Sequence, residues 1–154
     1  MIRKLSVLII SSLLLTGCSS VVGYLQNTFN FSYEKGVREE IADLPDELHV
    51  LAEQLYLGIR DKDRAMMNAV MQPKLIHDFD SDPLSVQEMS VYIPYYDQLI
   101  SKKILSAKRI ENSNHPTVLV IIYEYQYENQ KVTYEVQFNS DDQYQKVAGV
   151  FIHI

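Results

Sequence analysis

The last third of this chain alternates between apolar and polar residues. In its longest run, Leu119, Ile121, Tyr123, Tyr125 and Tyr127 occupy every second position. A period of two is typical of strands that bury one face. Short turn-forming segments separate the runs, so we expect three or four antiparallel strands joined as a meander. The runs cover residues 104–110, 117–128, 132–138 and 144–154.

Upstream of these runs the period changes to that of an α-helix. Leu48, Leu51, Leu55 and Ile59 fall at helical spacing behind a start signal at 43–47, where Pro45 suits the first turn. A shorter helix capped by Asp63 and an irregular stretch with helical pieces follow. This order predicts an α+β domain over residues 44–154: a long N-terminal helix plus short helices, packed on a curved antiparallel meander sheet of 3–4 strands.

The strand over 117–128 changes character along its length. Val118, Val120 and Ile122 are apolar on the side that later carries Glu124 and Gln126. A strand with one wet face alternates throughout, so the sheet is predicted to bury part of its second face. Two covers are weighed equally. They are the amino-terminal segment around Phe29 and Phe31 folded back, and another chain, for which a homodimer is the first expectation.

The amino terminus has the order of a secretory signal. Arg3 and Lys4 precede an apolar run over 5–15, and Thr16-Gly17 precedes Cys18. The apolar run is too short for a transmembrane helix, which needs about 20 residues. Cys18 is the only cysteine of the chain, so a disulfide within the chain is excluded.

Leu15-Thr16-Gly17-Cys18 resembles the lipobox of bacterial lipoproteins. The resemblance implies a signal peptide over 1–17, lipidation of Cys18 by a diacylglyceryl group with a further acyl chain such as palmitate, and a lipidated tether over 18–43. Several acyl chains are needed for stable anchoring. The implied location is the cell envelope, with a membrane anchor. Because Ser19 rather than aspartate follows the cysteine, it is the outer membrane if the cell is Gram-negative.

The net charge of the chain limits the classes of partner that we expect. The chain has a net charge of −6, and removal of Arg3 and Lys4 with the signal makes it more acidic. An acidic chain is not typical of nucleic-acid binding or of a polybasic lipid-binding surface, so no nucleic-acid partner is expected.

The domain resembles the cystatin-like cone and, within it, the nuclear-transport-factor-like superfamily. The residues that carry this resemblance are the helix Leu48–Ile59, the polar break at 60–63 and the carboxy-terminal QYQKVAGVFIHI. Small envelope lipoproteins with such a domain are common. The fold hosts enzymes, ligand binders and assembly modules, so it implies no single function.

Two patterns could carry chemistry. Asp78, Asp80 and Asp82 are spaced as in a calcium loop, but Pro83 and Met89 stand where that loop needs glycine and glutamate, so no metal site is predicted. The four histidines lack ligand spacing. An Asp–His pair inside the cone, His153 with Asp97 or Asp78, is the catalytic alternative.

Six tyrosines form two clusters that could make a recognition surface or simply pack. They are Tyr92, Tyr95, Tyr96, Tyr123, Tyr125 and Tyr127. We expect a non-catalytic lipoprotein without a cofactor that binds an envelope protein partner or a small apolar ligand. The alternatives are a small pocket enzyme of the same superfamily and an assembly subunit of an envelope complex.

Overall fold

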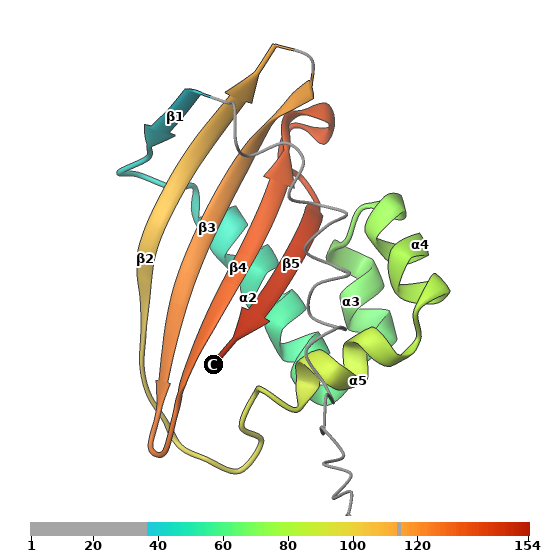
Figure 1. Cartoon of the computed structure of the whole chain (residues 1–154), viewed down its shortest axis with the longest axis vertical. Coiled ribbons are helices and arrows are strands. Elements are labelled where there is room, and N and C mark those ends of the chain that lie inside the picture. The colour runs from blue at the N-terminus through green and yellow to red at the C-terminus, as the bar shows by residue number, and fades with distance from the viewer. Residues whose placement is uncertain (1–36, 114) are drawn as a thin grey trace, which may run out of the picture. The chain divides into compact units, whose positions relative to one another are not determined.

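Five antiparallel strands form the framework of the computed structural model, which describes residues 37–113 and 115–154 (Figure 1). The strands follow one another in the sheet in chain order, so each pairs with its neighbour in sequence. They are β1 (Val37–Glu40), β2 (Leu99–Asn112), β3 (His115–Tyr127), β4 (Lys131–Asn139) and β5 (Val147–His153). Three of the connections are short, as the turn signals predicted.

Four helices of the described part lie between β1 and β2 in the chain. They are α2 (Asp46–Asp61), α3 (Arg64–Val70), α4 (Pro73–Ser81) and α5 (Leu84–Ser90). Helix α2 lies against one face of the sheet, and α3 to α5 gather beyond β5 (Figure 1). A hydrogen bond from Gln72 N to Val147 O, 2.8 Å long, ties the start of α4 to β5. The α+β class predicted from the sequence is confirmed.

The predicted count of three or four strands is wrong, because β1 adds a fifth. It lies inside the range predicted as a tether and precedes α2, so the long helix is not the first element. All four residues of β1 are exposed, and they show no apolar alternation that could announce a strand. Backbone pairing joins it to β2, and exposed salt bridges of Glu39 with Arg109 and Glu40 with Lys108 lie across the pair. The predicted signal peptide, Cys18, Phe29 and Phe31 lie outside the described residues.

The core lies between α2 and the sheet. The predicted stripe on α2 is buried at Leu48, Leu55 and Ile59, with Ala52 and Tyr56 beside it. The odd-numbered positions of β3 from 119 to 127 are all buried, so the predicted alternation selects the correct face.

The face of the sheet away from α2, here called the outer face, is also partly buried. Val120 on β3 and Ile110 on β2 are each 7% exposed, and their cross-strand neighbours Gln137 and Val118 are buried and half-buried. Burial of this second face is therefore confirmed at these positions. The homodimer that would cover it stays a prediction.

Candidate functional site

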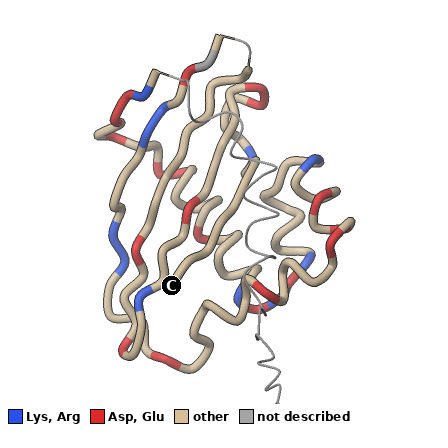
Figure 2. Tube along the Cα trace, in the orientation of Figure 1, with Lys and Arg blue, Asp and Glu red and all other residues tan. Residues whose placement is uncertain are grey.

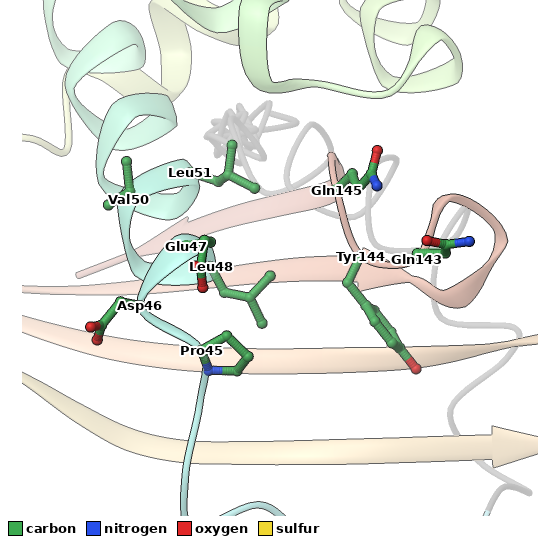
Figure 3. Close-up of a pocket in the computed structure, with 9 residues that line it drawn as sticks. All are labelled: Pro45, Asp46, Glu47, Leu48, Val50, Leu51, Gln143, Tyr144 and Gln145. Carbon is green, nitrogen blue, oxygen red and sulfur yellow. The ribbon is translucent and has the colours of Figure 1, made fainter.

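A groove of about 660 Å³ opens where the start of α2 approaches the connection from β4 to β5 (Figure 3). We call it the α2 groove. One wall comes from the first turns of α2 and the other from the residues that lead into β5. Its lining residues are Pro45, Asp46, Glu47, Leu48, Val50, Leu51, Gln143, Tyr144 and Gln145. In Figure 3 the side chains of Pro45 and Leu48 face Tyr144 across the gap.

The α2 wall follows from the local sequence. Pro45 stands at the N-cap with φ −57°, and its carbonyl accepts the backbone N–H of Leu48 at 3.1 Å. Asp46 and Glu47 lie in the first turn, where a negative charge is stabilised by the helix dipole. Val50 is 63% exposed, lies off the core stripe and is one of the residues that line the groove.

The opposite wall depends on a strained backbone. The short 3-10 turn η2 (Ser140–Asp142) ends at Gln143, and both Gln143 and Tyr144 have left-handed φ, 58° and 63°. For residues with a Cβ this conformation costs about 1–2 kcal/mol each. A hydrogen bond from Tyr144 N to Asn139 O at 3.0 Å helps to hold the turn. Strain of this kind is retained more often at functional sites than elsewhere.

This arrangement defines what the groove can bind. Its floor and walls offer Leu48, Leu51, Val50 and the Tyr144 ring, while carboxylates and two glutamine amides lie at the rim. Ligand sites commonly combine an apolar lining with a few polar groups that orient the ligand. The α2 groove therefore suits an apolar ligand or side chain with a neutral or cationic polar end.

Sequence signals for this site are weak. The predicted turn between the runs 132–138 and 144–154 is present, but the prediction that the last strand begins at Tyr144 is wrong, because β5 starts only at Val147. The left-handed pair contains no glycine to announce it. Val50, an apolar residue beside the core stripe, was the one available sign on α2.

The structure separates the six predicted tyrosines. Tyr123, Tyr125 and Tyr127 are buried in the core at 3%, 1% and 4% exposure, so these three pack against α2 instead of forming a surface. Tyr95 and Tyr96 are exposed, and Tyr92 is half-buried. The exposed pair is in edge contact at 5.1 Å, with the Arg60 guanidinium 5.6 Å from the Tyr95 ring. Recognition by these three stays a prediction.

The buried tyrosines form a network with α2. The Tyr56 and Tyr125 rings stack at 4.0 Å, and Tyr134 meets Tyr56 edge-on at 5.1 Å. Each hydroxyl of the network has a partner on α2 or within the network. These contacts join His49 Nδ1 with Tyr123 at 2.8 Å, Tyr56 with Tyr127 at 2.9 Å, Tyr125 with Glu53 at 3.2 Å, and Tyr134 with the Ala52 carbonyl at 2.9 Å.

Burial controls the electrostatics of this network. It raises the pKa of Tyr56, Tyr125 and Tyr134 well above that of a free phenol, since a buried phenolate loses its hydration. The carboxylate of Glu53 raises the pKa of Tyr125 further. The phenols therefore remain neutral hydrogen-bonding groups. Their rings fill the space between α2 and the sheet.

The acidic stretch is a helix. Asp78 and Asp80 lie on α4, where Asp78 pairs with Lys74 at 3.0 Å and Asp80 with Arg64. Among the described residues no group of three acidic, histidine or cysteine side chains converges as a metal site would require. Asp97 accepts a hydrogen bond from Asn129 at 3.2 Å, and His153 is exposed opposite Thr133.

Comparison with protein family models, characterised proteins and solved structures found no match to this chain. Within residues 37–113 and 115–154, none of the helices has the length and apolar character required to cross a bilayer.

Proposed function

We propose that this protein is a lipid-anchored lipoprotein of the bacterial envelope whose α+β domain binds a small apolar ligand, or an apolar side chain of a partner protein, in the α2 groove. The observation that carries the proposal is the groove itself. It combines an apolar lining, an acidic rim and a wall built on two left-handed residues.

The anchor rests on the sequence. The lipobox-like Leu15-Thr16-Gly17-Cys18 follows a charged and then apolar segment, which supports cleavage before Cys18 and lipidation of its thiol. A binding domain held by lipid at the membrane surface samples ligands near that surface. In a Gram-negative cell, the proposed location is the outer membrane.

The finer fold, a cystatin-like cone, belongs to the same proposal. Three register shifts in the β2–β3 ladder accompany a bend of the long strands over α2, as bulges do in curved sheets (Figure 1). Where a cone enzyme would have an open interior, the rings of Tyr56, Tyr125 and Tyr134 are at most 1% exposed. This filling favours packing over catalysis and moves the binding role to the groove outside.

Binding of the neutral dye Nile red to the lipid-free chain from Ser19 to Ile154 tests the proposal. We expect enhanced dye emission with the wild type and affinity lower by about tenfold in Val50→Asp, because a carboxylate placed against the apolar lining must be desolvated. Val91→Asp is the matched control, since Val91 is an exposed valine outside the groove. Equal binding by both variants, or no binding by the wild type, would contradict the proposal.

A further inference from the structure

Strand β2 is paired along only half of its outer edge. On its inner side it pairs with β3 from Leu99 to Asn112. On its outer side β1 covers Lys108 to Glu111, and a last hydrogen bond joins Ile41 N to Ala107 O at 2.8 Å. Among the described residues, the segment Leu99–Ser106 has no strand on that side (Figure 1). We call this segment the free edge.

The backbone directions of the free edge follow from the ladder. The backbone N–H of Tyr127 points to β4, where it donates to Gln130 O. The backbone N–H and C=O groups of the neighbouring even-numbered residues of β3 therefore point the other way, to β2. Glu124 opposite Lys103 is one of them, which directs the backbone of Lys103 inward. The backbone groups of Lys102 and Ile104 therefore point outward, where a further strand would pair.

The free edge combines features that protect an edge with side chains typical of an interface. Natural edges are blunted by charge, proline, bulges or a cover, and this segment carries two lysines and two register shifts of the β2–β3 ladder. Here four large apolar side chains are exposed beside two lysines. They are Leu99, Ile100, Ile104 and Leu105. At the other side of the sheet, by contrast, Met71 and Gln72 cover the start of β5.

Charge indicates which strand would fit. Basic residues follow one another along β2, and β1 meets two of them with Glu39 and Glu40 (Figure 2). The paired half of β2 therefore already takes an acidic neighbour. In the free half, Lys103 contacts Glu124 at 2.9 Å, but its side chain is still 59% exposed and can contact a second carboxylate.

A second copy of the chain fits this edge poorly. Antiparallel pairing requires the outward residues Lys102 and Ile104 to oppose outward residues of the copy. The registers that use most of the free edge are centred on Lys102 or Lys103, and each sets a lysine directly against its own copy. Like charges in directly opposed positions destabilise a strand pair.

We propose that the free edge of β2 binds an extended acidic segment of a partner protein by strand addition, in line with β1. The added strand would place carboxylates beside Lys103 on the outer face and apolar side chains beside Ile104 on the other. Main-chain hydrogen bonds would supply affinity and the alternating side chains specificity. This surface is distinct from the α2 groove and does not depend on a ligand there.

The test uses the full chain purified in detergent and a fluorescent peptide of about nine alternating valine and glutamate residues, long enough to span the free edge. Anisotropy should show binding, weaker by about tenfold in high salt or with a valine–lysine peptide, because surface charge pairs are screened and like charges repel. Equal binding of the two peptides would overturn the charge argument.

Two variants locate the contact. Ile104→Pro removes an outward N–H and should weaken binding about tenfold relative to Ile104→Ala, which removes the same side chain but keeps the N–H. Lys103→Glu should reverse the preference between the two peptides. This variant tests the contact by itself if Ile104→Pro does not fold. Unchanged binding in both variants, or a dimer that occupies the edge in sedimentation, would refute strand addition.

Discussion

Tyr56 and Tyr125 show how a polar residue can serve as core. Their rings stack at 4.0 Å with an interplanar angle of 10°, while their hydroxyls reach Tyr127 and Glu53. Each ring supplies a large buried apolar area, and aromatic pairs add about 0.5–1.5 kcal/mol beyond it. The hydroxyls keep hydrogen-bond partners, so the polar tips do not cancel that gain.

This network predicts alkaline instability. Because burial raises the pKa of Tyr56, Tyr125 and Tyr134, the unfolded chain loses phenol protons at pH values where the folded chain keeps them. The contribution of these phenols to the free energy of unfolding should be constant below pH ~10 and then fall by about 1.4 kcal/mol per pH unit for each buried phenol. Urea unfolding across this range measures it. Tyr125→Phe should reduce the slope, and an unchanged slope would contradict the assignment.

At the scale of elements, Gly58 fixes how closely α3 approaches α2. A Cβ on Gly58 would lie 2.8 Å from Met67 Cγ and 3.3 Å from Met67 N. Met67 is fully buried, so neither atom can move away freely. Helix propensity alone would favour alanine over glycine at this position by about 1 kcal/mol.

We therefore expect Gly58→Ala to lower the free energy of unfolding by about 1–3 kcal/mol, as overpacking does. Denaturant unfolding measures the change. In a double-mutant cycle with Met67→Ala, the cost of Gly58→Ala should shrink, because the clashing Cγ is gone. Val50→Ala, at an exposed site of the same helix, should change stability by less than about 0.5 kcal/mol. A stabilising Gly58→Ala would show that propensity outweighs the contact.

Helix α4 determines the outcome expected with calcium. Its Asp78 and Asp80 are separated by the helical rise and engaged by Lys74 and Arg64, instead of converging on one point. Millimolar calcium should leave the melting temperature unchanged. A site filled at 100 times its dissociation constant would add about 2.7 kcal/mol. A rise in melting temperature that a chelator reverses would contradict this.

For the whole molecule, the proposed location rests on one proposed modification, lipidation of the Sγ of Cys18. Each buried methylene of an acyl chain contributes about 0.8 kcal/mol to membrane binding, so the lipid would dominate partitioning. Cys18→Ala should move the protein from the membrane pellet to the soluble fraction, or leave it uncleaved. Mature wild type that enters the aqueous phase in a detergent phase separation would contradict the anchor.

The outer face of the sheet gives the last prediction. Val120 is 7% exposed in a single chain, so Val120→Glu would bury a charge and should destabilise by more than about 2 kcal/mol. Val91→Glu, at an exposed valine after α5 and outside the sheet, should cost less than about 1 kcal/mol. Denaturant unfolding compares the two. Sedimentation of the same proteins tests the homodimer. A wild-type protein that stays monomeric at high concentration would contradict it.

Much of the fold could be predicted from the sequence, because burial of one face imposes a period on the apolar residues of a helix or strand. The stripe Leu48–Leu55–Ile59 and the alternation along β3 each follow from one buried face on a regular element. Strand β1 shows no such period, because all four of its residues are exposed. Its charge pairs are with a strand about 70 residues away, so no neighbouring residues indicate them. Asp78 and Asp80 have the spacing of a calcium loop but lie on a helix, because the spacing of acidic residues does not by itself distinguish a loop from a helix.

The α+β class, the buried face of each long element and the lipobox-like segment at Cys18 could be recognised from the amino-acid sequence, because each depends on neighbouring residues and simple periods. The two candidate sites depend on how distant segments pack. The α2 groove joins Pro45 and Val50 to Tyr144, nearly a hundred residues later, through a left-handed turn that no glycine marks. The free edge of β2 exists because β1 stops at Glu40 while β2 extends to Leu99, and a pairing between segments about 70 residues apart leaves no local pattern in the sequence.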